Sequence, residues 1–198
     1  IARELDYFGL LTTVFGARPW TDEATFRPGP AMRDRRSQCA VVSAGGRVLV
    51  FGQAALLGNF TKNTTELIDA QTMASTAGPN LLAHRPDCAA VLLDADCALV
   101  VGGSSLFVDE MNLNTTEILH LSTLTLTPGP KLQSTRSGCA AVALDARRIL
   151  VVGGNDGESS LSSTEILSLD TMAFTPGPDM ATPRSGCAAV ALDEHRIM

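Results

Sequence analysis

One short sequence recurs along this chain at a nearly constant interval. It reads RSQCAV, RPDCAA, RSGCAA and RSGCAA at residues 36–41, 85–90, 136–141 and 184–189. Its cysteines are 49, 51 and 48 residues apart, and they are Cys39, Cys88, Cys139 and Cys187. A period of this length is typical of propeller blades and similar arrays. The sequence therefore predicts a tandem repeat, a class of fold that usually serves as a binding platform.

Each repeat carries the signals of four short strands, which are clearest in the third copy. Two apolar runs at 139–144 and 148–152 are joined by Asp145-Ala146, which predicts a tight hairpin. A glycine pair ends the second run, a polar loop follows, and further strands are expected at 163–169 and around Phe174. Because the prolines after Phe174 cannot donate to a ladder, the fourth strand should lie at the outer edge of its sheet.

Small residues at the head of the first strand indicate that this strand is innermost, because crowding around a central axis would exclude large side chains. Four-stranded antiparallel sheets that repeat radially make a β-propeller. Within 21–198, the expected units are about 31–79, 80–130, 131–178 and an incomplete 179–198. Since the last unit stops partway through, we expect the chain to be part of a longer protein.

The repeat resembles the kelch family in its R-S-G start, in the Gly153-Gly154 pair that ends the second strand and in the aromatic residue of its second half. This resemblance, which covers about 21–198, implies an all-β fold. The expected structure is a kelch-type β-propeller fragment of about three and a half blades of four antiparallel strands. The family often carries tyrosine in the third strand, where this chain has aliphatic residues such as Leu167, and these bury less area between sheets.

Residues 1–20 do not fit the repeat. Ile1, Leu5, Phe8 and Leu11 fall near helical spacing, which predicts a short helix before the propeller. The string ELDYFGL at residues 4–10 resembles the last helical region of BTB domains of the potassium-channel tetramerisation type. Together with a kelch array, this implies the substrate-recognition subunit of a cullin-RING ubiquitin ligase, which binds a cullin through a BTB domain upstream. A helical linker of no special kind is the alternative.

The composition disfavours several other functions. The net charge is -6 and no long run of lysine or arginine occurs, so neither nucleic acid nor an anionic membrane surface is an expected partner. No apolar segment approaches the roughly 18 residues that cross a bilayer.

Catalytic chemistry also has little support. The three histidines, His84, His120 and His195, lie at unrelated phases of the repeat, and no G-x-S-x-G, Walker or H-E-x-x-H motif occurs. Some kelch-type propellers resemble copper radical oxidases, but the one tyrosine, Tyr7, lies outside the expected propeller. We therefore expect a non-enzymatic protein with no catalytic residues, metal site or cofactor. The remote alternative is a carbohydrate-active or oxidative enzyme whose site lies outside this sequence.

The five cysteines are expected to be free thiols. The four repeat copies lie on successive blades, farther apart than the roughly 7 Å between α carbons that a disulfide spans. In a hairpin centred on Asp94-Ala95, Cys97 faces Leu92 and cannot bridge to Cys88. Small buried thiols favour a reducing compartment and therefore a cytoplasmic protein.

Three N-x-T sequons, at Asn59, Asn63 and Asn114, keep an alternative open. An extracellular kelch binding module could carry glycans on these loops. The simpler explanation is that asparagine and threonine favour the turn before a third strand.

Two charged positions recur with the repeat. One holds arginine, at Arg36, Arg85, Arg136 and Arg184, which we call the leading arginines. The other holds glutamate, at Glu66, Glu117 and Glu165. A ring of arginines around a ligand is one interpretation, but a recurring charge usually has a partner, so we favour structural arginine–glutamate pairs.

Binding should be carried by the loops that differ between repeats. In kelch proteins that capture peptides, these loops share a face with the serine after the leading arginine. The resemblance thus implies a partner-binding site made of Ser37, Leu57, Phe60, Lys62, Phe107, Asp109, Glu110, Ser137, Asn155, Asp156, Glu158 and Ser185. Acidic residues in two of these loops favour a protein or peptide partner of basic or polar character.

Overall fold

The computed structural model describes residues 29–54, 63–105, 112–193 and 196–198. It separates residues 1–30 from a second compact unit, Ala31–Met198, which contains all the described strands. Every described element is a strand, as expected of an all-β fold. The helix predicted within 1–20 lies outside the described residues. In the part of the chain that the structure describes, we find no helical segment with the length and apolarity that a membrane crossing requires.

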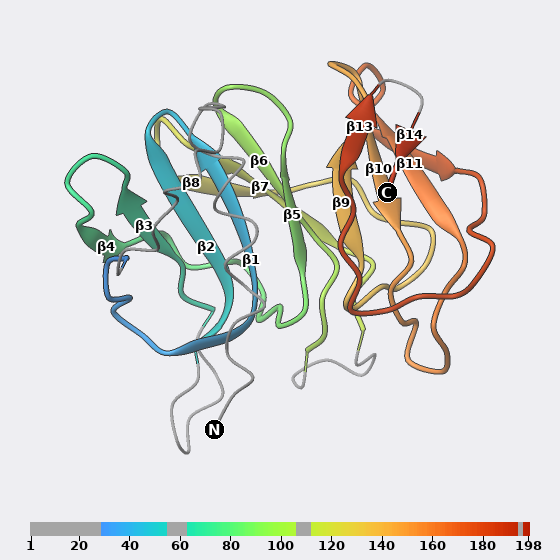
Figure 1. Cartoon of the computed structure of the whole chain (residues 1–198), viewed down its shortest axis with the longest axis horizontal. Helices are drawn as coiled ribbons and strands as arrows, with labels where there is room; N and C mark the ends of the chain where they lie inside the picture. Colours follow the sequence, from blue (N-terminus) through green and yellow to red (C-terminus); the bar gives the residue numbers. More distant parts are fainter. Residues whose placement is uncertain (1–28, 55–62, 106–111, 194–195) are drawn as a thin grey trace, which may run out of the picture. The chain divides into compact units, whose positions relative to one another are not determined.

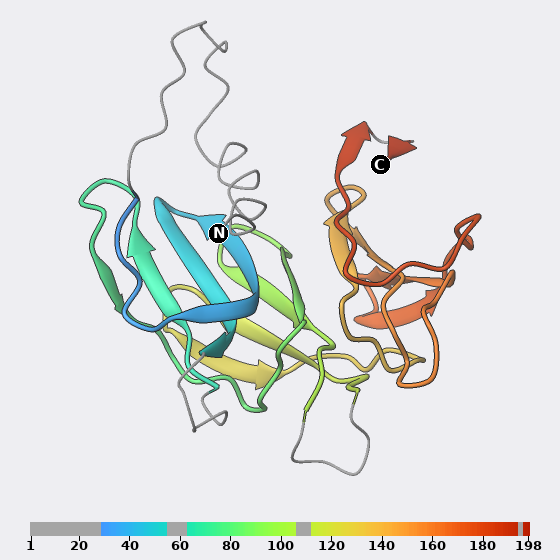
Figure 2. The same ribbon diagram turned by 60° about the horizontal axis from the view of Figure 1, so that its bottom comes forward.

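The described strands form antiparallel sheets, three of which have four strands each (Figures 1 and 2). The first sheet contains β1 (Arg36–Ala44), β2 (Arg47–Ala54), β3 (Glu66–Asp69) and β4 (Ser75–Ala77). The second contains β5 (Ala89–Leu92), β6 (Cys97–Val101), β7 (Thr116–His120) and β8 (Thr125–Pro128). The third contains β9 (Ala140–Ala143), β10 (Arg148–Val152), β11 (Thr164–Ser168) and β12 (Ala173–Pro176). A hairpin of β13 (Ala191–Asp193) and β14 (Arg196–Ile197) follows.

The order of the strands agrees with the predicted blade. Each four-stranded sheet keeps sequence order from one edge to the other, so the proline-terminated fourth strand lies at an edge. The first strands of successive sheets contact one another, β1 with β5 and β5 with β9. The prediction of an inner first strand and an outer fourth strand is thus confirmed.

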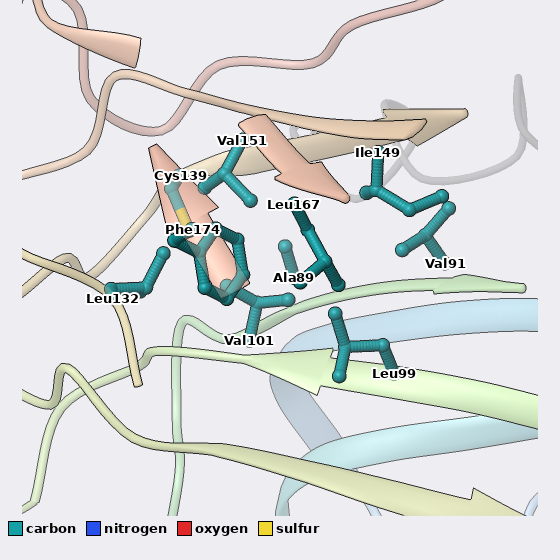
Figure 3. Close-up of a cluster of buried hydrophobic side chains, with 10 residues drawn as sticks. All are labelled: Ala89, Val91, Leu99, Val101, Leu132, Cys139, Ile149, Val151, Leu167 and Phe174. Atoms are coloured by element: carbon teal, nitrogen blue, oxygen red, sulfur yellow. The ribbon is translucent and has the colours of Figure 1, made fainter. Parts of the chain in front are cut away.

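The core lies between the sheets. In β6, Ala98 and Val100 pack with the first sheet, whereas Leu99 and Val101 pack with the third. This alternation follows from the period of two along a strand. All four side chains are 0% exposed, so the second sheet is buried on both faces. Figure 3 shows the second of these interfaces, where Leu99 and Val101 lie near Leu167 and Phe174.

The register of two hairpins differs from the prediction. Leu92 pairs with Ala98, and Ala143 pairs with Ile149, so each loop has one residue more than a two-residue turn. Cys97 therefore does not face Leu92, and that prediction was wrong by one residue. The cause is the aspartate that opens each loop: the Asp94 carboxylate accepts the backbone amides of Asp96 and Cys97, both at 2.7 Å.

The first hairpin behaves as a two-residue turn. Ala44 pairs with Arg47, and Gly45 and Gly46 have φ of 57° and 75°. A type I′ turn needs positive φ at both positions, which glycine adopts at little cost.

Candidate functional site

The leading arginines of the three four-stranded sheets, Arg36, Arg85 and Arg136, have buried side chains that link strands of their own sheet, whereas Arg184 is exposed. In the second sheet, Arg85 Nε donates to Glu117 Oε1 at 2.6 Å. Its other nitrogens donate to the carbonyls of Gly102 and Thr115 at 3.0 and 2.8 Å and to the Thr115 hydroxyl at 2.8 Å. The Glu117 carboxylate also accepts the amides of Leu82 and Ala83, at 2.7 and 2.9 Å. Both charged side chains are buried, and their hydrogen-bonding capacity is used inside the protein.

The same network recurs in the neighbouring sheets. Arg36 Nε lies 2.8 Å from Glu66 Oε1, and Arg136 Nε lies 3.1 Å from Glu165 Oε1. The predicted structural pairing is confirmed for these arginines. A ligand-binding ring of arginines is wrong for them, since their guanidinium groups already donate to internal acceptors.

Backbone hydrogen bonds join the heads of the inner strands. The amide of Asp87 donates to the carbonyl of Gln38 at 3.1 Å, Gly138 donates to Asp87 at 2.8 Å, and Gly186 donates to Gly138 at 2.8 Å. These four residues have φ of 53°, 57°, 60° and 61°. A left-handed backbone conformation costs a residue with a side chain roughly 1–2 kcal/mol, so the surrounding structure must hold Gln38 and Asp87 in a conformation that is unfavourable for them. The result is a continuous backbone path across four successive repeats.

Side chains at this path differ between repeats. Gln38 Nε2 donates to Asp87 Oδ2 at 2.6 Å, whereas the third and fourth repeats have glycine. Burial raises the pKa of Asp87. The path therefore carries polar side chains on only one part of its length.

Three predicted binding residues lie together beside this path. Ser137 and Asn155 exchange backbone hydrogen bonds of 2.9 and 2.8 Å. Asn155 also forms an antiparallel β-bridge with Ser160, and the Ser160 hydroxyl lies 3.0 Å from the hydroxyl of Ser185. Ser37 has the matching position in the first sheet, where it pairs with Gln53 and is exposed.

The loop that carries Asp156 and Glu158 is fixed by local hydrogen bonds. The Asp156 carboxylate accepts the amides of Ser159 and Glu158 at 2.8 and 2.9 Å, and these bonds hold the pKa of Asp156 below its ordinary value. Asn155 Oδ1 accepts the amide of Gly157 at 2.8 Å. Glu158 is left exposed at the tip of an ordered turn.

Asn112 also belongs to this region, although the sequence analysis missed it. Its side-chain amide donates to the carbonyl of Asn155 at 2.8 Å, which links the second sheet to the third. It is 7% exposed. An asparagine at the end of a variable loop was the only signal in the sequence.

We name the surface formed by Ser37, Ser137, Asn155, Asp156, Glu158 and Ser185 the serine face. The remaining predicted binding residues lie outside the described residues, and they are Leu57, Phe60, Lys62, Phe107, Asp109 and Glu110.

The comparison with known protein families agrees with this architecture. Residues 135–181 match the Kelch motif, a span that includes the third sheet and its leading arginine. The match supports a kelch-repeat family for this region. No curated protein matches the chain.

Proposed function

We propose that this protein is a non-enzymatic interaction module that binds a partner protein through the serine face. Kelch repeats are generally non-catalytic and commonly bind protein partners. The observation that carries the proposal is the contact between repeats at Ser137, Asn155 and Ser185, which gathers polar groups of separate blades beside one backbone path. Arg36, Arg85 and Arg136 are occupied in the interior, whereas Arg184 is exposed next to Ser185, so recognition rests mainly on hydroxyl, amide and carboxylate groups.

The charge of the serine face favours a basic or polar partner. Asp156 and Glu158 supply two carboxylates, and Asp156 stays ionised because backbone amides stabilise its charge. Because the loop is already ordered by its own hydrogen bonds, binding a partner would lose little further conformational entropy in this loop. A peptide with lysine or arginine beside hydrogen-bonding groups fits this surface.

The variant Glu158→Lys tests the face, with Ala146→Lys as its matched control. Both positions are exposed and both lie in the third blade, but they are on loops at opposite ends of β10. We expect the protein purified from its own cells to lose a reproducible set of partners with E158K and to keep it with A146K. Equal recovery with both variants would sink the serine face as the binding surface. Far-UV circular dichroism checks that both variants remain folded.

We further propose a cytoplasmic location and a role in presenting the bound partner to a cullin-RING ubiquitin ligase. All five cysteines are free, which supports a reducing compartment. The link to a cullin rests on the BTB resemblance of residues 4–10. Co-purification of a cullin that is lost when residues 1–20 are deleted would support it.

The extracellular alternative has a separate test. The Asn63 side-chain nitrogen, which would carry a glycan, donates to the carbonyl of Leu81 and is half-buried. We therefore expect an unmodified Asn63 in mass spectra of the native protein. A glycan at Asn63 or Asn114 would instead move the protein outside the cytoplasm.

A further inference from the structure

Three different metal-binding groups meet at the hairpin end of the second sheet. Asp96 lies in the β5–β6 loop, and Cys97 and His120 are directly paired across β6 and β7. Their ligand atoms all lie within 4.8 Å of one another. This cluster is independent of the serine face, because it lies at the opposite end of the strands.

The spacing of the two strand residues fits a tetrahedral metal. Cys97 Sγ lies 3.5 Å from His120 Nδ1. Zinc binds sulfur at about 2.3 Å and imidazole nitrogen at about 2.0–2.1 Å, and tetrahedral angles then place the two atoms about 3.5 Å apart. The side chains therefore need little movement to share one ion.

Outer hydrogen bonds orient the other ligand atoms. The Asp96 carboxylate accepts the backbone amide and the hydroxyl of Ser122, both at 2.8 Å. His120 Nε2 lies 3.4 Å from the Thr127 hydroxyl, so the ring nitrogen that faces away from Cys97 also has a partner. Supporting contacts of this kind are typical of metal ligands, where they fix the ring and carboxylate orientations.

The charge at this place differs from that of the third sheet. There Arg148 pairs with Asp145 at 2.7 Å, and Arg147 pairs with Asp170 at 3.0 Å, so two aspartates are balanced by two arginines. The second sheet keeps an aspartate at the first position, Asp94, but has Asp96 and Cys97 where the third has the arginines. Two carboxylates therefore lack the cations of the matching site, and a divalent ion would restore the balance.

A nucleophilic cysteine is a poorer explanation of the same cluster. The Asp96 carboxylate binds Ser122 rather than His120, so it does not orient the imidazole as a general base for the thiol.

We propose that Asp96, Cys97 and His120 bind one zinc ion, with water as the fourth ligand. A thiolate, an imidazole and a carboxylate are the ligand types that zinc accepts, and three protein ligands leave one position open. The thiol proton is released to solvent when the ion binds.

Cobalt(II) substitution and zinc titration test the site in the whole chain. We expect one equivalent of Co²⁺ to give a thiolate-to-metal charge-transfer band that Cys97→Ser abolishes. Cys187→Ser, which removes another half-buried thiol, should keep the band. For Zn²⁺, we expect His120→Asn to weaken binding by at least about tenfold, since even the loss of an outer partner weakens metal binding 10–100-fold.

Several outcomes would overturn the site. These are no charge-transfer band in the unaltered protein, a band that survives in C97S, or equal zinc affinity in H120N and the unaltered protein. H120N keeps the thiol, so it decides the question if C97S fails to fold. Because neither residue lies on the serine face, loss of metal binding and loss of partner binding are separate results.

Discussion

Replacing Glu117 by glutamine measures what the buried arginine–glutamate network contributes to stability. The Glu117 carboxylate accepts hydrogen bonds from Arg85 Nε and from the amides of Leu82 and Ala83. Glutamine has almost the same shape but only one acceptor oxygen, and its amino group donates. E117Q therefore leaves a buried donor without an acceptor and the Arg85 charge uncompensated.

The structure sets the size of this effect. Removing one partner of a buried ion pair costs about 3–5 kcal/mol. Arg85 keeps its hydrogen bonds to Gly102 and Thr115, which continue to solvate the cation. We thus expect the lower end of the range, about 3 kcal/mol, within a total stability of about 5–15 kcal/mol for a domain.

Urea denaturation followed by far-UV circular dichroism gives the free energy of unfolding. The matched control is Asp170→Asn, which breaks the Arg147–Asp170 pair at 3.0 Å, where the two side chains are 74% and 60% exposed. An exposed pair of this kind contributes less than about 1 kcal/mol. If E117Q lowers the free energy of unfolding no more than D170N does, the buried ion pair contributes no more stability than the exposed one, and the reasoning is wrong.

Three further predictions concern other buried groups of the sheets. Burial favours a raised pKa for Glu66, but hydrogen bonds from the Arg33 amide, Arg36 and Ser75 outweigh it and lower the pKa from 4.5. The stability that the Glu66 carboxylate gives the folded protein should therefore be complete above pH 4.5 and lost as pH falls through the lowered pKa. Urea unfolding at several pH values should show this loss, and Glu66→Gln should flatten it. Gly153→Ala should lower the melting temperature more than Gly186→Ala. The two glycines have nearly the same φ, 60° and 61°, but only a Cβ at Gly153 would lie 2.5 Å from a carbonyl oxygen, that of Arg184. Burial raises the pKa of Cys88 and Cys139 to about 12, so mass spectrometry should show slower alkylation of these thiols than of Cys187 in the native protein, and equal rates would contradict the packing.

The repeating contacts were predictable from the sequence. An arginine and a glutamate that recur together predict an ion pair in each repeat, because a buried charge requires a partner. The small residues after each repeat cysteine likewise indicated the inner strand. These patterns can be recognised in the sequence because they occur in every copy of the repeat.

Features that belong to one repeat were harder to predict. The hairpin register was wrong because the Asp94 side chain binds two loop amides, and this adds a residue to the turn. The cluster at His120 was missed because its partner, Cys97, lies across a strand pair rather than nearby in sequence. In an alignment of the repeats, Cys97 matches Arg47 and Arg148, and His120 matches Asp69 and Ser168, so only the second repeat pairs a cysteine with a histidine there.

The second sheet meets its two neighbours through opposite faces. Leu99 and Val101 face the third sheet, and the matching residues of the first sheet, Leu49 and Phe51, face the second. In the language of oligomers this is a heterologous contact, in which the front of one unit meets the back of the next. A duplicated blade inherits both halves of the contact, so it fits between its neighbours without new substitutions. Gene duplication alone can then lengthen such an array, while later mutations are free to diversify its loops.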